Sequence, residues 1–242
     1  MEYFSGIIGQ ERALVPLRRA LETGQINHAY LFIGPGGIGK RTTAAAFARA
    51  LILMADAQGE AYIEDNVHPD LMVVEKIESK TLIGIEQINQ VMEPWLAMKP
   101  YRASRRVVII KEAHLLSLPA ANALLKTLEE PPGHAVIIML SDELGLLETI
   151  ISRCQMIRFS PLLESSIKEF LMGRGIDEVN ATQLAGMGQG SIAAALHLAE
   201  KEDRDELWNT ARSIIKELSA GSEAEVFKCA ESIAKDPALL VS

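Results

Sequence analysis

The segment that decides the fold spans residues 30–40 and reads YLFIGPGGIGK. Its first four residues are apolar and favour a β-strand, and the rest fits the G-x-x-x-x-G-K pattern of a phosphate-binding loop. Glycines let the backbone curl so that its N–H groups point at an anion, and the helix that follows adds the partial positive charge of its N-terminus. The candidate phosphate-binding residues are Gly34, Gly36, Gly37, Gly39 and Lys40.

Two positions that hold Mg²⁺ in a working site of this kind are altered. Arg41 stands where a Ser or Thr hydroxyl normally binds the metal. Thr42 is one residue further along a helix, which turns by about 100° per residue, so its hydroxyl does not substitute. The apolar run 107–110 ends in Lys111 in place of the expected Asp, and Glu112 follows. Two cations in place of metal ligands predict negligible ATP hydrolysis and no metal at this site.

Two interpretations of the loop stay open. It either retains weak binding of ATP or phosphate without Mg²⁺, or it is a vestigial turn that only caps its helix. In neither case does the sequence require a cofactor.

Further along the chain, strand patterns alternate with helix patterns. Short β-rich runs predict strands at residues 29–33, 71–74, 107–110, 135–140 and 155–159, and the middle three are apolar enough to be buried on both faces. Helical spacing predicts helices at 40–54, 84–96 (kinked or shortened by Pro94) and 118–130. This alternation predicts an α/β fold with a parallel sheet and flanking helices.

Beyond Ser160-Pro161 only helical patterns remain, at residues 163–172, 178–187, 191–200, 203–218 and 224–234. We therefore predict a domain boundary near residue 161, a small helical domain over 162–202, and a third unit over 203–242 that is not completed at the last residue.

Composition narrows the class of protein. The net charge of −8 argues against a protein that coats nucleic acid through its overall field. One local basic patch is a candidate for DNA contact, with a solvated loop as the alternative: Lys99, Arg102, Arg105 and Arg106. No apolar run approaches the ~20 residues of a membrane span, and the N-terminus has no signal-peptide pattern, so we expect a cytoplasmic protein. Cys154 and Cys229 are too few and too far apart for a disulfide framework or a metal cluster.

Several further segments carry a family resemblance: IIGQ at 7–10, HAYLF at 28–32, HPD at 68–70, ANALLKTLEEPP at 121–132 and SRC at 152–154. Together with the phosphate loop, and at matching spacing over roughly residues 4–200, the chain resembles the bacterial clamp-loader subunits of the AAA+ ATPase family. The resemblance implies an AAA+ P-loop domain over 1–161, a helical lid over 162–202 and the truncated start of a helical collar domain over 203–242.

Two types of subunit in that family are candidates. The tau/gamma type is the ATP-hydrolysing motor, and the delta-prime type commonly lacks hydrolysis and acts as a stator. Arg41 and Lys111 favour the delta-prime type, and so does Ala194, which stands where active members carry an arginine that reaches the γ-phosphate. Many members also bind zinc through four cysteines between the loop helix and the HPD segment, but residues 55–67 contain no cysteine, so we expect no zinc site.

Arg153 is the candidate catalytic residue. The resemblance implies that it points into the nucleotide site of a neighbouring subunit and acts there in trans, a task that suits a permanently charged guanidinium fork. The alternative is a local salt bridge, for which Glu148 is one partner in reach. The implied partners are tau/gamma motor subunits, the delta subunit, and the sliding clamp and primed DNA through the complex. The sequence thus predicts a non-hydrolysing loader subunit; the alternatives are an active tau/gamma-like ATPase and a scaffold without catalytic influence.

The remaining reactive side chains are predicted to be structural or inactive. Cys154 is expected to be a small buried hydrophobe, and the five histidines have no metal-ligand spacing. Ser141-Asp142 occupies the place of a polar sensor in working ATPases. Nothing in the sequence suggests polymerase chemistry, although membership of a DNA polymerase complex would class the chain with DNA-directed DNA polymerases.

Overall fold

The computed structural model describes residues 3–64 and 67–200. The chain forms two compact units, Met1–Ala194 and Ala195–Ser242. Only residues 195–200 of the second unit are described, so the predicted helices at 203–218 and 224–234 lie outside the described part. The predicted boundaries at residues 161 and 202 remain predictions.

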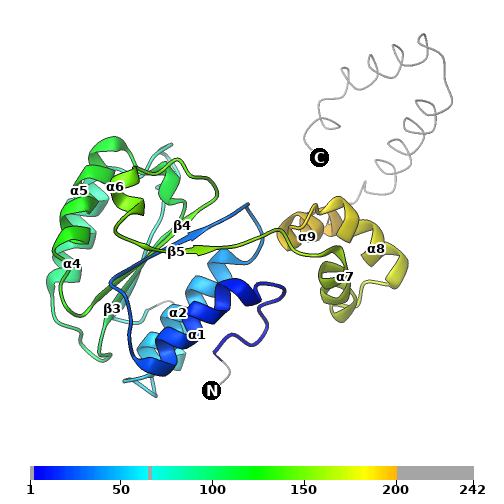
Figure 1. The fold of residues 1–242 in the computed structure, drawn as a ribbon, viewed down its shortest axis with the longest axis horizontal. Helices are drawn as coiled ribbons and strands as arrows, with labels where there is room; N and C mark the ends of the chain where they lie inside the picture. Colours follow the sequence, from blue (N-terminus) through cyan, green and yellow to red (C-terminus); the bar gives the residue numbers. More distant parts are fainter. Residues whose placement is uncertain (1–2, 65–66, 201–242) are drawn as a thin grey trace, which may run out of the picture. The chain divides into compact units, whose positions relative to one another are not determined.

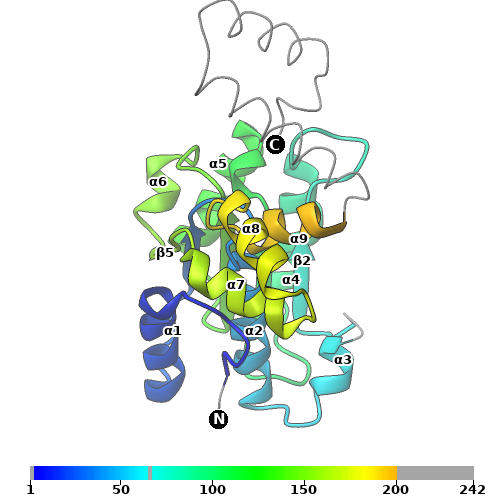
Figure 2. The same cartoon turned by 90° about the vertical axis from the view of Figure 1, so that its right-hand side faces the viewer.

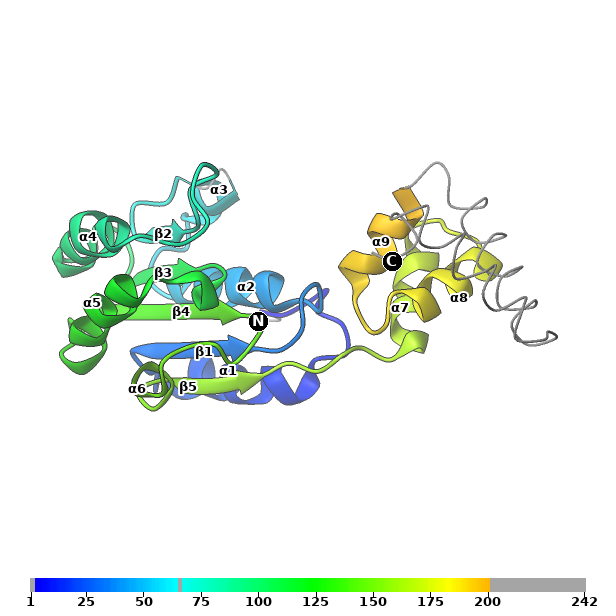
Figure 3. The same cartoon turned by 90° about the horizontal axis from the view of Figure 1, so that it is seen from above.

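The first unit is built on a five-stranded sheet in the order β2-β3-β4-β1-β5, and every pair of neighbouring strands is parallel. In Figure 3 the labelled arrows run side by side in one direction. The predicted α/β fold is confirmed, and each strand begins and ends within one residue of its predicted bounds: β1 (Ala29–Ile33), β2 (Leu71–Val74), β3 (Arg106–Ile110), β4 (Ala135–Ser141) and β5 (Gln155–Arg158).

One prediction about burial is wrong. β3 and β4 are buried along their whole lengths, as expected, and so is β1. β2 is not, since Val73 is 42% exposed. The reason is position, because β2 is an edge strand with a neighbour on one side only.

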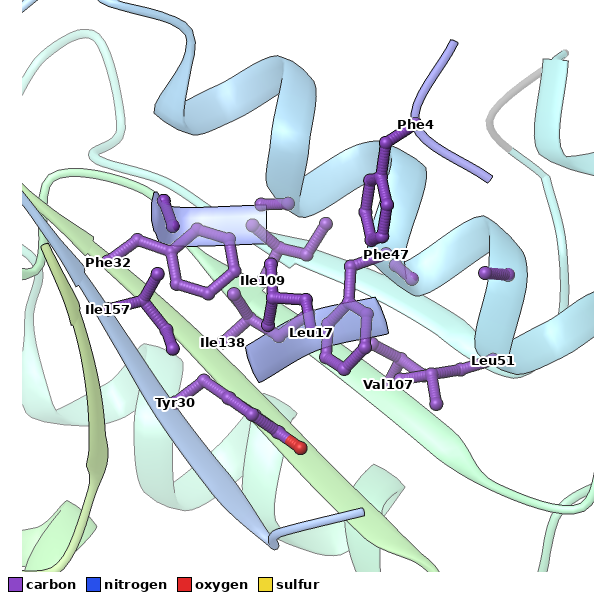
Figure 4. Close-up of a cluster of buried hydrophobic side chains, with 14 of the residues drawn as sticks. Phe4, Leu17, Tyr30, Phe32, Phe47, Leu51, Val107, Ile109, Ile138 and Ile157 are labelled. Atoms are coloured by element: carbon purple, nitrogen blue, oxygen red, sulfur yellow. The ribbon is translucent and has the colours of Figure 1, made fainter. Parts of the chain in front are cut away.

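Alternate residues of the strands face two separate helical layers. On one face lie α1 (Glu11–Thr23) and α2 (Lys40–Leu53), and their apolar side chains pack on Tyr30, Phe32 and Ile109 in one core (Figure 4). Helix α1 is not among the predicted segments, although Leu14, Leu17 and Leu21 show helical spacing.

The opposite face carries helices whose apolar residues pack on Leu31, Val108 and Ile137. Figure 1 shows α4, α5 and α6 together on this side of the sheet. The bounds are η1 (Gln87–Met92), α4 (Glu93–Ala97), α5 (Leu118–Glu129) and α6 (Glu148–Ile151); the short α3 (Glu60–Glu64) follows α2, and η2 (Ala113–Leu115) follows β3.

The predicted helix at 84–96 contains a wider turn than expected. Residues Gln87–Met92 form a π-helix, and an α-helical turn, Glu93–Ala97, follows with Pro94 in its first positions. Proline has no N–H to donate, and the first turn of a helix is the place where none is needed. The chain therefore accommodates Pro94 through a change of helix type before it.

Helices α7 (Glu164–Gly173), α8 (Glu178–Met187) and α9 (Ile192–Glu200) follow the sheet and match the predicted segments within one residue. Helices α7 and α8 pack against each other, as Figure 2 also shows. None of the described helices combines the length and apolar character needed to cross a membrane.

Candidate functional site

The phosphate loop connects the carboxyl end of β1 to the first turn of α2. Gly39 is the N-cap of α2 with φ 101°, and Gly37 has φ 73°, both in the left-handed region that favours glycine. The loop thus has the turn geometry that its sequence predicts, with Lys40 as the first residue of the helix.

Lys40 is fully engaged by its own chain. Its side chain is only 6% exposed, and its Nζ donates to the carbonyl oxygens of Gly34 and Pro35 and pairs with Asp142 Oδ1 at 2.8 Å. An ammonium group has three N–H donors, so these three acceptors use all of them. A phosphate at this loop would have to displace at least one of these partners.

The start of α9 also lies against the loop. Ala193 N donates to the carbonyl oxygen of Gly37 at 3.3 Å, and the Ser191 side chain lies so close that a Cβ on Gly37 would overlap its Oγ. Ala194, which the resemblance predicts to stand in place of an arginine of active members, is exposed and offers a methyl group only. No cationic side chain therefore replaces that arginine at this position.

The two cations predicted at the metal position act on one carboxylate. Lys111 Nζ bonds to the carboxylate of Glu75, and its backbone N donates to Val74 O at 2.9 Å. The hydrogen bond and charge of Lys111, together with the charge of Arg41, lower the pKa of Glu75. This arrangement does not fit Mg²⁺, because two fixed positive charges take the place of its hydroxyl and carboxylate ligands.

Glu75 was not predicted from the sequence. It directly follows β2, and Lys111 directly follows β3, so the parallel pairing of these two strands brings them together. A sequence could indicate this pair only through the position of each residue directly after a predicted strand, since adjacent parallel strands end at the same edge of the sheet.

The residues after β3 and β4 are also held locally. Glu112 adopts φ 50° and ψ 48°, an uncommon conformation for a residue other than glycine, and η2 begins directly after it. Ser141 Oγ and His114 Nδ1 are 3.5 Å apart, and Asp142 pairs with Lys40. The predicted sensor residues Ser141 and Asp142 thus contact protein groups.

Arg153 lies at the other end of the sheet. It precedes β5, whose first residue, Gln155, is in register with Tyr30 near the start of β1. The phosphate loop follows the end of β1, so the strand length, about 3.3 Å per residue, separates the two sites. Arg153 therefore does not reach the phosphate loop of its own chain.

Arg153 forms a salt bridge, but not with the residue predicted. Its Nη2 donates to Glu129 Oε1 at 2.6 Å and its Nη1 to the Thr149 carbonyl at 2.9 Å. Glu148, suggested by sequence proximity, is not the partner. The Arg153 and Glu129 side chains are 34% and 52% exposed, so water screens the pair, which is worth at most about 1 kcal/mol.

Two members of the predicted basic patch are used inside the fold. Arg102 binds Asp56 through Nε at 2.6 Å and stacks on Tyr62. Arg106 is 6% exposed, donates to the Trp95 carbonyl at 2.7 Å and lies over the indole ring. Arg106 is therefore buried within the fold, whereas the Arg102 side chain is held by Asp56 and remains 30% exposed.

The histidine and aspartate of the HPD segment hold the loop that carries those arginines. Asp70 is fully buried and accepts backbone N–H bonds from Tyr101, Arg102 and Ala103 at 2.7–2.9 Å. Burial raises its pKa, but these bonds and Arg106 outweigh it, and the net pKa is lowered. His68 accepts from Asp70 N and faces Asp56 at 3.3 Å, which is a structural role as predicted.

The environment of Cys154 favours its neutral thiol and a structural role. Burial raises the pKa of its thiol to about 12, and its Sγ donates to the Ile150 carbonyl at 3.0 Å. The thiolate that nucleophilic or metal chemistry requires is therefore disfavoured. No group of three or more His, Cys, Asp or Glu side chains in residues 3–64 and 67–200 is arranged to hold a metal.

Gln10, from the IIGQ segment, links three parts of the first unit. Its Nε2 donates to Ile38 O at 3.1 Å and to Ser160 O at 2.8 Å, and its Oε1 accepts from Ser160 N at 3.3 Å. The N-terminal segment, the phosphate loop and the segment that leaves β5 are thus joined by one buried side chain.

The parallel sheet and its glycine-rich loop define a P-loop α/β domain of the AAA+ type. A solved structure of the RuvB Holliday junction branch migration motor of Thermotoga maritima matches with a TM-score of 0.56 at 19% identity, over 95% of this chain and 71% of that one. At this identity the match shows the shared fold alone.

Comparison with sequence families is more specific. The family model described as DNA polymerase III, delta subunit, matches residues 9–163, and the chain belongs to this family. The chain is 31% identical to DNA polymerase III subunit gamma of Buchnera aphidicola subsp. Acyrthosiphon pisum, over 82% of this chain and 58% of that protein. It is 34% identical to DNA polymerase III subunit tau of Bacillus subtilis, over 84% of this chain and 36% of that protein. The chain thus spans between about a third and three fifths of these relatives.

Proposed function

We propose that this chain is a non-hydrolysing, delta-prime-like subunit of a bacterial clamp loader, and that it supports loading of the sliding clamp onto primed DNA. The observation that supports this proposal is the bond of Lys111 to Glu75, with the charge of Arg41 acting on the same carboxylate. These two cations stand at the sequence positions where a working P-loop site has its metal ligands. Without a metal, nothing bridges the β- and γ-phosphate oxygens of ATP. The chain's own loop then serves at most as a weak anion site.

In this proposal Arg153 assists hydrolysis in a neighbouring tau/gamma motor subunit. The distance from its own loop, with the two sites at opposite ends of the strands, supports a role in trans. An arginine supplied in this way can raise the rate of phosphoryl transfer by about 10³–10⁵-fold. The delta subunit would be the other neighbour, and the clamp and primed DNA would be contacted through the complex.

The second candidate function is an active motor of the tau/gamma type. The curated relatives support this function at least as well as the delta-prime-like one, because the two compared above are named gamma and tau. Under this alternative Arg41 and Lys111 are tolerated, and the Lys40–Asp142 pair opens when nucleotide binds.

The arginine-finger part of the proposal is tested by ATP turnover in a reconstituted loader. We expect Arg153→Ala to lower the clamp- and DNA-stimulated rate at the neighbouring site by about ten-fold or more, because transition-state charge loses its partner. An unchanged rate in an intact complex would leave the chain as a scaffold.

A further inference from the structure

We propose that Glu129 is the positioning residue for Arg153, holding its guanidinium in the orientation that a neighbouring nucleotide requires. The proposal rests on the proposed function, since it takes Arg153 to act in trans. It assigns a role to the carboxylate at the last residue of α5.

The contacts of Arg153 leave part of its fork free. Nη2 is fixed by Glu129 Oε1 at 2.6 Å and Nη1 by the Thr149 carbonyl at 2.9 Å. A guanidinium has five N–H donors, so three remain after these two bonds. Among the described residues no other acceptor contacts Arg153, which leaves these donors available to phosphate oxygens.

The two acceptors lie on two helices that pack against each other. Glu129 is the last residue of α5, next to the buried Leu128, and Thr149 belongs to α6, which packs on α5. The same turn of α5 is held from the other side, because Thr127 Oγ1 donates to Glu93 Oε1 at 2.8 Å. A carboxylate at this position can therefore fix an otherwise flexible arginine in one direction.

The pair is also weak enough to yield. Both side chains are partly exposed, at 34% and 52%, so the bridge is screened by water. A triphosphate carries more negative charge than one carboxylate and can compete for the guanidinium. Glu129 thus favours one rotamer of Arg153 before the nucleotide binds, and the guanidinium can still pair with the phosphate oxygens of that nucleotide.

The test compares four variants in the reconstituted loader with clamp and primed DNA, measured as ATP turnover per assembled complex. We expect Glu129→Gln to lower kcat by about 3- to 10-fold with little change in KM, because a misoriented arginine loses transition-state contacts. Glu129→Asp, which keeps the charge on a shorter arm, should recover part of this loss. Glu130→Gln is the matched control, as its exposed neighbouring carboxylate does not contact Arg153.

Two results would overturn the proposal, and they differ in what they leave standing. In the first, Arg153→Ala lowers ATP turnover, but the turnover of Glu129→Gln equals or exceeds that of Glu130→Gln. Glu129 then does not position the arginine, and the trans role of Arg153 stands. If Arg153→Ala has no effect, the proposed function fails and the role of Glu129 fails with it. Equal thermal unfolding of the Glu129→Gln and wild-type chains would show that a loss of kcat is not a loss of folding.

Discussion

At the scale of single residues, the chemistry of the phosphate site is decided by charge. The three N–H donors of Lys40 bond to the carbonyl oxygens of Gly34 and Pro35 and to the Asp142 carboxylate. Lys111 forms a salt bridge with Glu75. The glycines still form the turn that a phosphate needs, so the loop keeps its shape. The turn geometry of the loop is therefore independent of the residue types at positions 41 and 111.

The cluster around Asp56 makes stability depend on pH. The hydrogen bond from Arg102, together with His68, lowers the pKa of Asp56 from its ordinary 3.8 to about 2. A carboxylate with a lowered folded-state pKa stabilises the fold when ionised. This contribution is complete above about pH 5 and is lost as the pH falls from about 4 to about 2.

We therefore expect Asp56→Asn to lower the free energy of unfolding most near neutral pH, with a difference from wild type that narrows as the pH falls below about 4. Urea unfolding at several pH values between 3 and 7 measures this difference. Glu78→Gln, which changes an exposed carboxylate outside the cluster, is the control. A difference that stays constant across this range would mean that the Arg102–Asp56 pair does not stabilise the fold.

At the scale of elements, helix ends are set by local chemistry that the sequence reveals. Asp177 caps α8, accepting hydrogen bonds from Val179 N and Asn180 N at 3.1 Å each. Removal of such a cap typically costs about 1 kcal/mol. We expect Asp177→Ala to lower the free energy of unfolding by about this amount in urea titrations.

The control for the cap is Ser165→Ala, an exposed serine inside α7. Ser165 is exposed and is not the cap of its helix, so this change should leave the free energy of unfolding nearly unchanged. Equal losses in both variants would argue that the Asp177 cap contributes nothing specific.

The elements also show what local patterns can predict. All five strands and the helices α2, α5, α7, α8 and α9 follow from apolar periodicity and breakers, within one or two residues. The exposure of β2 does not follow, because strand order is a property of the whole sheet. The π-helical turn before Pro94 arises where a helix must accommodate a residue that cannot donate.

The candidate site was predicted only in part for a similar reason. The phosphate loop is contiguous, so its pattern reveals it. The partners of Lys111 and Arg153 lie 36 and 24 residues away in sequence, and only the packing of strands and helices brings them together. Glu148 lies closer in sequence to Arg153 than Glu129 does, yet α5 supplies the carboxylate.

At the scale of the whole molecule, the first unit places its two candidate sites at opposite ends of one sheet. The phosphate loop lies at the carboxyl end of β1, and Arg153 lies at the amino end of the adjacent β5. One end is closed by contacts within the chain, and the other presents a partly exposed arginine. This division suits a subunit that contributes to a neighbour's site rather than to its own.

The central claim is that this chain does not hydrolyse ATP at its own loop, and the most direct test is the Mg²⁺-dependent ATP turnover of the purified protein, with Lys40→Ala as the control for contaminating activity. We predict a rate equal to that of the control, with or without Mg²⁺, because in our proposal Arg41 and Lys111 stand where a working site has its metal ligands. A Mg²⁺-dependent rate that Lys40→Ala abolishes would contradict the account and identify the chain as a motor of the tau/gamma type.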